Sequence, residues 1–271
     1  MTTDYKVTDT ELVAVADAIR SKGETQALLE WPNGYISAIN AIPTPIDIVS
    51  WADGTDEQIV AMLQAAHNGD IDLQTDGGWA VGDTRTIAIT SFTSGDNISV
   101  PAQSIDIVIS QFGDYNSCGC VMQFDFKQSL SNELRMNSTQ TTSGGYEGSL
   151  MKASTIPALV NALPSWLKTN LVEFSCAAGG GTVTGNKLAL RSEMEIYGSV
   201  TQGTAIEGSQ IEYYVDKPKP TKTLGRGGSN SAWTCRTVST YSGFFVSVGL
   251  YGNAAYGAAD GRYGLSPFGC L

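Results

Sequence analysis

The side chains that carry most metal and nucleophilic chemistry are scarce in this chain. It has one histidine, His67, and five cysteines, at positions 118, 120, 176, 235 and 270. Histidine-ligated zinc sites, iron sites with two histidines and metalloprotease helices are excluded, because each needs at least two histidines. A Ser-His-Asp triad would depend on His67, which we expect on the surface late in a helix. Composition therefore argues against many enzyme classes.

The cysteines form no recognisable metal motif in the sequence. Cys118-Gly-Cys120 is too closely spaced for the usual zinc knuckle, and no second pair lies nearby to complete four ligands. An odd number of cysteines in a chain that starts without a secretory signal is typical of reduced thiols, several of them buried as small apolar side chains. We predict no bound metal and no cofactor.

Two other stretches superficially match ligand-binding loops. Residues 70–77 resemble a calcium loop, but Gln74 occupies the third ligand position and Thr75 the position where that loop requires glycine. We interpret this stretch as a solvated turn, with a structural calcium site as the alternative. Gly179-Gly-Gly181 is followed by Thr-Val-Thr and not by the lysine of a phosphate loop, which predicts a flexible turn.

The charge of the chain is strongly uneven. The net charge is −11 over 271 residues, and residues 1–80 carry 3 basic and 13 acidic side chains. Because an acidic surface repels phosphate backbones and anionic lipids, we expect no nucleic-acid partner. No apolar run approaches the roughly 18 residues of a membrane-spanning helix, and the first residues lack the apolar stretch of a secretory signal. Membrane insertion and ordinary secretion are not expected.

Hydrophobic periodicity predicts helices in the front part of the chain. Residues 8–11 and 55–58 are capping-box patterns, and each precedes apolar residues at helical spacing. Another helix is expected over 32–42, which starts at a proline and stops at Pro43-Thr-Pro45. We predict a helical attachment module at 1–46, an acidic helical connector at 47–80 and a second domain at 81–271. Isolated helices this short are marginal in water, so the module should pack on itself or on neighbouring chains.

From Val81 the pattern changes to short strands. A helix is expected only over 155–171, where Pro164 should divide it in two. The other regular segments are short, and the first three have β-branched or alternating apolar residues. They are 84–91, 105–109, 122–126, 188–190, 193–197 and 210–215. The predicted fold class of 81–271 is α+β, with short strands, few helices and long loops.

The stretch from Trp233 to Phe268 is unlike the rest of the chain. It holds 8 of the 24 aromatic residues, interleaved with glycine and almost without charge. Tyrosine combined with Gly, Ser and Asn is typical of binding loops, because tyrosine gives a large amphipathic contact area at low rotamer cost. The alternative is an irregular β-meander whose aromatic side chains fill its own core.

This last stretch resembles a family of phage and prophage proteins with a C-type-lectin-like domain. The family pattern is Trp-Trp-x-Arg-Ser followed by Gly-Leu-x-Pro-Phe-Gly-Cys. The matching segments are Trp233-Thr-Cys-Arg236-Thr237, Tyr256-Gly257 and Tyr263-Gly-Leu-Ser-Pro-Phe-Gly-Cys-Leu271. Further agreement comes from 81–85, 136–146 and 191–198, and the front, with Trp31-Pro-Asn-Gly34, resembles modules at the start of phage tail and fibre proteins. The chain departs from the pattern at Thr234 and Thr237.

The resemblance implies a virion protein that binds a host-cell receptor through its C-terminal domain. The receptor would be a protein or a glycan. In some members of the family a retroelement diversifies the C-terminal sequence. It also implies contacts with other tail proteins through the helical module, and a homotrimer. The positions that fall between scaffold residues, and are expected to bind the ligand, are Thr234, Tyr241, Phe244, Ser247, Tyr251, Asn253, Asp260, Arg262 and Tyr263. The expected scaffold residues are Trp233, Arg236, Glu193, Glu195, Gly264, Pro267, Phe268 and Cys270.

Arg236 is the single charge in an apolar strand, so we expect it to be buried and paired with Glu193 or Glu195. Two alternatives to receptor binding remain. One is a structural virion component without a receptor. The other is an oxidase similar to formylglycine-generating enzymes, which would need a reactive pair such as Cys235 and Cys270. Because Cys270 lies in the core-like Pro-Phe-Gly-Cys ending, we expect no enzyme activity.

Overall fold

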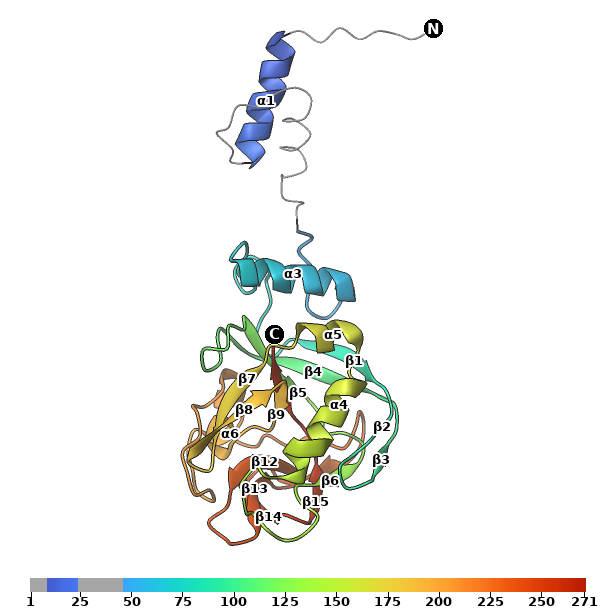
Figure 1. The fold of residues 1–271 in the computed structure, drawn as a ribbon, viewed down its shortest axis with the longest axis vertical. Coiled ribbons are helices and arrows are strands. Elements are labelled where there is room, and N and C mark those ends of the chain that lie inside the picture. Colours follow the sequence, from blue (N-terminus) through green and yellow to red (C-terminus); the bar gives the residue numbers. More distant parts are fainter. Residues whose placement is uncertain (1–8, 24–45) are drawn as a thin grey trace. The chain divides into compact units, whose positions relative to one another are not determined.

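The computed structural model describes residues 9–23 and 46–271 of this chain, which divides into two compact units, Met1–Asp47 and Ile48–Leu271 (Figure 1). The fold is α+β, as predicted, with more strand than helix. In the first unit, helix α1 runs from Asp9 to Gly23, close to its predicted bounds. Of its predicted apolar stripe, Ala16 and Ile19 are buried but Val15 is exposed. The helix expected at 32–42 lies outside the described residues.

Helix α3 (Asp56–Asn68) starts where its sequence predicts. Thr55 accepts a hydrogen bond from the Gln58 amide, and the Gln58 side chain accepts one from the Thr55 amide, which completes the capping box. His67 is exposed at its last turn. Gly69 ends the helix in a left-handed conformation with φ of 79°.

Residues 48–80 belong to the second compact unit and do not form a separate connector. The Trp51 ring contacts those of Trp79 and Trp166, with centroids 5.1 and 6.2 Å apart. Arg85 donates to the carbonyl oxygens of Trp51 and Gly54, and its Nη2 lies 2.6 Å from Asp56 Oδ1. The boundary expected at residue 80 therefore differs from the structural one, because these tryptophans and Arg85 join α3 to the sheet that follows.

The first of two five-stranded sheets has the order β1-β4-β5-β16-β9, with all pairs antiparallel. Its strands are β1 (Thr84–Ile89), β4 (Gln103–Phe112), β5 (Met122–Phe126), β16 (Phe268–Cys270) and β9 (Leu188–Ala189). The alternation of β5 predicts one solvated face, but all five of its residues are buried. The reason is that Gln123 and Asp125 bind a buried arginine, described below.

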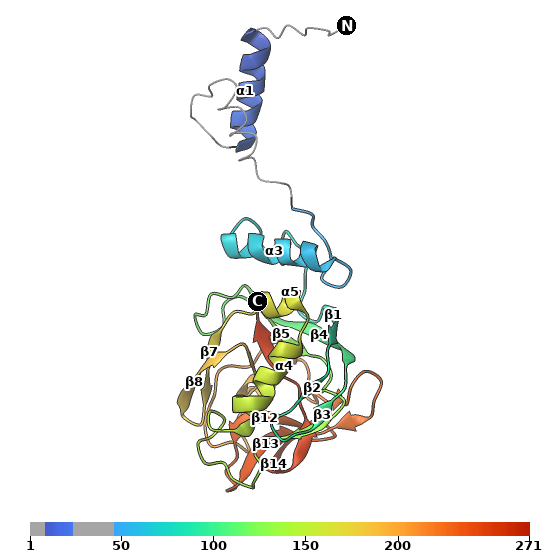
Figure 2. The same ribbon diagram turned by 45° about the vertical axis from the view of Figure 1, so that its right-hand side comes forward.

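The second sheet has the order β14-β13-β12-β15-β6, in which only β12 and β15 pair in parallel. Its strands are β14 (Ala254–Ala258), β13 (Phe244–Val248), β12 (Trp233–Val238), β15 (Arg262–Gly264) and β6 (Glu133–Arg135). Figures 1 and 2 show this sheet at the end of the unit that faces away from α3. A core cluster behind it includes Ile196, Tyr214, Trp233, Cys235 and Val246.

Shorter elements fill the space around the two sheets. The hairpins are β2 (Phe92–Thr93) with β3 (Ser99–Val100), β7 (Phe174–Ala178) with β8 (Gly181–Asn186), and β10 (Lys222–Thr223) with β11 (Asn230–Ser231). The helical elements are the π-helix η1 (Met151–Thr155), α4 (Ile156–Ala162), α5 (Ser165–Asn170), α6 (Glu193–Tyr197) and α7 (Glu212–Val215). Pro164 separates α4 from α5, as predicted. The segments 193–197 and 212–215 are helices, although the short regular segments at 193–197 and 210–215 predict strands.

Candidate functional site

The nine residues expected to bind a ligand divide into three groups by exposure. Tyr241, Tyr251, Asn253 and Arg262 are exposed; Phe244, Asp260 and Tyr263 are half-buried; Thr234 and Ser247 are only 2% exposed. Thr234 and Ser247 face each other across β12 and β13. Because both faces of this central pair are covered, the expectation that Thr234 and Ser247 contact a ligand is wrong.

Three aromatic rings gather beside β13: Phe244 on that strand, Tyr256 on β14, and Tyr241 in the turn between β12 and β13. The Tyr241 and Tyr256 rings have centroids 4.7 Å apart, and Phe244 meets Tyr256 edge-on at 5.6 Å. Phe244 pairs with Ala258, so Tyr256 is its diagonal neighbour on the next strand. Tyr241 and Tyr256 are each about half exposed. Tyr256 was assigned to the family pattern and not to the binding surface, although strand pairing places it between two predicted binding residues.

The turn of the same hairpin presents a second apolar group. Leu250 is 50% and Tyr251 is 79% exposed, at the tip between β13 and β14. Gly252 has a φ of 80°, and a Cβ there would lie 2.6 Å from the Lys219 backbone, so only glycine fits. Its carbonyl accepts a hydrogen bond from the Tyr197 hydroxyl at 3.0 Å. The exposed tip is therefore held by a fixed backbone.

We call Tyr241, Phe244, Leu250, Tyr251 and Tyr256 the aromatic surface. They account for four of the nine large hydrophobic side chains that are exposed among the described residues, with half-buried Phe244 as the fifth member. β14 is the edge strand of its sheet, so the surface lies at an open margin of the unit. Exposed apolar groups concentrated on one hairpin and the turn before it are typical of an interaction site.

Tyr263 and Arg262, two of the other predicted binding residues, take part in contacts within the unit. The Tyr263 hydroxyl accepts a hydrogen bond from the Ala258 amide at 3.1 Å, and its ring lies where a Cβ on Gly257 or Gly261 would be. Arg262 Nη2 lies 3.7 Å from Asp96 Oδ2, on the loop between β2 and β3. Tyr263 is thus half-buried and packed against its own sheet, whereas the sequence predicts it among the ligand-binding residues. Arg262 stays exposed to solvent.

Arg236 is fully buried and paired with Glu195, one of its two expected partners. Its Nη1 lies 2.6 Å from Glu195 Oε2 and donates to the Leu190 carbonyl, and its Nε donates to the Ala177 carbonyl at 2.7 Å. Glu195 also accepts hydrogen bonds from the Tyr115 hydroxyl and from the Ser192 amide. Arg236 therefore joins β12 to α6 through the ion pair and to β7 through the Ala177 carbonyl.

Glu193, the other expected partner, binds backbone instead of Arg236. Its carboxylate accepts hydrogen bonds from the amides of Thr201, Gln202 and Gly203 and from the Thr201 hydroxyl. It therefore orders the loop after α6. Glu207 is also buried, and it accepts from the Gly179 amide and the Thr237 hydroxyl.

A second buried ion pair was not predicted from the sequence. Arg191 lies between the two sheets, and its Nη2 is 2.7 Å from Asp125 Oδ2. It also donates to the Gln123 and Ser110 side chains, and its guanidinium stacks 3.6 Å from the Phe268 ring centroid. The sequence signal for this pair is Asp125, an acidic residue between Phe124 and Phe126 in a predicted strand. Phe268, one of the expected scaffold residues, is fully buried.

Trp233 and Pro267 also occupy scaffold positions. Trp233 is buried and donates from Nε1 to the Pro220 carbonyl, and the buried Lys222 ammonium lies 4.5 Å from its ring. Burial lowers the pKa of Lys222 to about 8. Lys222 donates to the Phe126 carbonyl and the Ser266 hydroxyl. The Pro267 carbonyl accepts from the Phe126 amide. These contacts tie the family-like ending of the chain to β5.

Acid is expected to destabilise the second unit through Glu195 and Asp125. Burial raises the pKa of each carboxyl, but the adjacent guanidinium groups reverse this and hold both pKa values below the ordinary 4.5 and 3.8. Such groups contribute stability that is fully present above their unfolded pKa and is lost as the pH falls through the folded pKa. Urea unfolding between about pH 5 and pH 2 should show a falling free energy of unfolding. The variant Arg236→Met/Glu195→Gln should show a shallower fall, and an equal slope would contradict this origin.

The turn at 70–77 satisfies its own carboxylates. Asp72 accepts from the Gln74 and Thr75 amides, and Asp76 accepts from the Asp72 amide. These hydrogen bonds hold Asp72 at a pKa below its ordinary value. Within residues 9–23 and 46–271, the carboxylates of this turn do not form a group of three that could hold an ion. The arrangement agrees with the solvated turn.

The cysteines of the oxidase alternative lie in different surroundings. Cys235 packs in the apolar cluster with Trp233 and Val246, and burial raises the pKa of its thiol far above the ordinary value. Cys270 groups with Cys118 and Cys120. A buried, protonated thiol is a poor nucleophile.

Comparison with known protein families, with characterised proteins and with solved structures finds no match. Among the described residues, the helices include none that is both long and apolar enough to cross a membrane.

Proposed function

We propose that this chain is a phage tail or fibre protein that binds a host-cell receptor through the aromatic surface. One observation carries the proposal: Tyr241 in the turn before β13 and Leu250, Tyr251 and Tyr256 on the β13–β14 hairpin are all exposed. Gly252 fixes the backbone of the hairpin tip, and β13 pairs with β12, which the buried Arg236–Glu195 ion pair anchors. Tyrosine is enriched in binding hot spots, because its ring gives contact area at little entropic cost. The short strands and long loops of the second unit fit the C-type-lectin-like architecture that the resemblance implies.

The first unit is proposed to attach the protein to other tail proteins and to further copies of itself. Exposed Val13 and Val15 on α1 are side chains that a neighbouring copy would cover. The homotrimer expected from the resemblance would then place several aromatic surfaces on one virion, where weak individual contacts add up by avidity. A purely structural virion component is the alternative, and it predicts no receptor contact at the hairpin.

Removing Tyr251 or Tyr241 is expected to weaken receptor binding without unfolding the protein. The measurement is binding of the fluorescent full-length chain to a panel of bacterial strains, with the variants tested on any strain that binds the unmodified protein. Truncation of a central anchor loses about 2 kcal/mol of binding, or roughly a 30-fold weaker affinity. Loss of an exposed side chain changes folding stability by less than about 0.5 kcal/mol, so the melting temperature should move by no more than about 2 °C.

The matched control is Ile206→Ala, because Ile206 is 76% exposed but lies outside the hairpin. It should retain both binding and melting temperature. If Tyr251→Ala and Tyr241→Ala lower the melting temperature but keep binding, the side chains stabilise the fold and the proposal fails. If no strain binds the unmodified chain, the structural alternative is favoured.

A further inference from the structure

Three cysteines from distant parts of the chain converge in the second unit. Cys118 and Cys120 belong to the loop 113–121 between β4 and β5, and Cys270 is the last residue of β16. Because Cys270 pairs with Gln123 on β5, it lies beside that loop. The three Sγ atoms all lie within 4.8 Å of one another. None of the five cysteines forms a disulfide.

The backbone of the loop is unusual and serves to position Cys118 and Cys120. Asn116 and Ser117 have φ values of 51° and 60°, and only one other non-glycine residue among those described has a positive φ. Side chains rarely adopt this conformation, and it tends to persist at functional sites where the surroundings enforce it. Here the Tyr115 amide donates to Cys120 Sγ at 3.3 Å and the Gly119 amide donates to Asp114 Oδ1 at 2.8 Å. The loop is thus shaped around the sulfur atoms.

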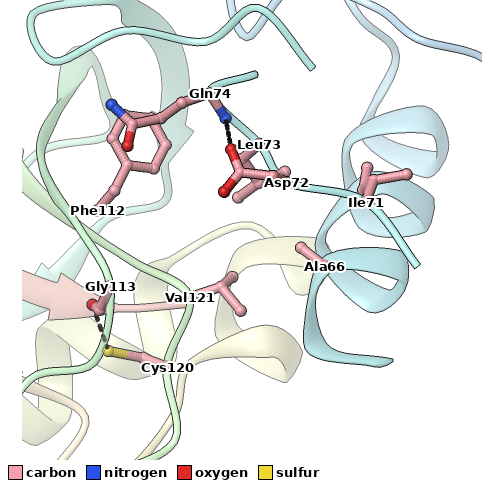
Figure 3. A pocket seen from close by; sticks show the side chains of 9 residues that line it. All are labelled: Ala66, Ile71, Asp72, Leu73, Gln74, Phe112, Gly113, Cys120 and Val121. Carbon is pink, nitrogen blue, oxygen red and sulfur yellow. Dashed lines mark hydrogen bonds between the residues drawn. The ribbon is translucent and has the colours of Figure 1, made fainter. Parts of the chain in front are cut away.

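The three thiols differ in their access to solvent. Cys120 and Cys270 are buried, and Cys118 is half-buried. Cys120 also borders a cavity of about 390 Å³, which Phe112, Val121 and residues 71–74 line from other sides. Figure 3 shows the Cys120 sulfur directed at the Gly113 carbonyl at the edge of this cavity. Because Cys118 is half-buried, an ion can reach the three sulfur atoms from the Cys118 side without unfolding of the sheet.

We propose that Cys118, Cys120 and Cys270 together bind one thiophilic metal ion, Cu(I) or Zn²⁺. Thiolate sulfur is the ligand that selects these soft ions. Sulfur atoms bound at about 2.3 Å to one ion are roughly 3.8 Å apart, so spacings up to 4.8 Å need only small side-chain movements. Each thiol would release its proton to solvent as it binds.

The number of ligands separates the two ions. Among the described residues, no carboxylate or histidine joins the three sulfurs. Cu(I) is satisfied by three thiolates in a plane, whereas Zn²⁺ adopts four ligands and would need a water at the half-buried Cys118 side. The sequence predicts no metal here, because no second cysteine pair lies close to Cys118 and Cys120 in the chain. The third ligand comes instead from the neighbouring strand.

The test is a competition titration of the reduced, metal-free, full-length protein. Zn²⁺ and Cu(I) are each presented as a complex with a chromophoric chelator, and metal content is measured after gel filtration. We expect about one ion per chain, and Co²⁺ in place of Zn²⁺ should give the thiolate-to-metal charge-transfer absorption of a sulfur-ligated ion. The ion that the protein removes from its chelator is the ion that the site binds.

Variants distinguish this site from adventitious binding to thiols. Cys118→Ser should fold, since the residue is half-buried, and should lower the affinity by at least about 100-fold. Cys176→Ser is the control, because it also removes a thiol but one outside the group, and it should bind the ion like the unmodified chain. The proposal is overturned if neither ion is retained, if Cys118→Ser and Cys176→Ser bind equally well, or if the chain isolates with a disulfide among the three and takes up no metal after reduction.

Discussion

Replacing Arg236 with alanine is expected to lower the free energy of unfolding of the second unit by about 3–5 kcal/mol. The substitution leaves the Glu195 carboxylate fully buried without its cation, and it removes donors to the Ala177 and Leu190 carbonyls. For a unit of this size, each kcal/mol moves the melting temperature by roughly 2–4 °C, so a fall of at least about 6 °C is expected. Calorimetry and urea unfolding measure it directly.

Two further variants test whether the unpaired charge is responsible. Arg236→Met/Glu195→Gln removes both charges with similar volume, and it should recover much of the lost stability. Arg226→Ala is the control for losing an arginine from an ion pair, because Arg226 is about half exposed and 3.4 Å from Asp106. It should lose less than about 1 kcal/mol. A double variant as unstable as Arg236→Ala would refute the charge explanation and point to lost packing.

Asp125→Asn is expected to destabilise the first sheet by a similar amount, about 3–5 kcal/mol. Asparagine keeps the size of the side chain but leaves the Arg191 guanidinium buried without an anion, and Asp125 is also the acceptor for the Tyr214 hydroxyl at 2.9 Å. The midpoint of urea unfolding should move to a lower urea concentration, while the dependence of the unfolding free energy on urea stays unchanged. The exposed Asp216→Asn serves as the control and should unfold like the unmodified protein. An Asp125→Asn variant of unchanged midpoint would mean that Arg191 needs no counter-ion.

Local patterns predicted much of the helical structure, because capping and proline act within a few residues. The capping box at Thr55 and the break at Pro164 are both found in the structure. The helix at 193–197 could have been predicted the same way, since Ser192 and Glu195 form a capping box too. The short length of that segment favoured a strand interpretation instead.

Long-range pairing explains what the sequence could not predict. Arg236 was expected to need an acidic partner from its apolar surroundings, but the choice between Glu193 and Glu195 depended on how α6 is oriented. Likewise, Thr234 is buried because both faces of β12 are covered, and alternation alone cannot reveal a strand covered on both faces. The grouping of Cys118 with Cys270 required knowledge that β16 lies next to β5.

The position of β16 also constrains how the protein is made. This strand is inserted between β5 and β9, although β1, β4 and β5 are synthesised long before it. Until Phe268–Cys270 has emerged, β5 and β9 each present an unpaired edge that can bind another chain. Sheets closed by such distant segments form slowly, because the intervening chain must be ordered first. Nascent chains of this protein should therefore depend on chaperones for longer than their modest size suggests.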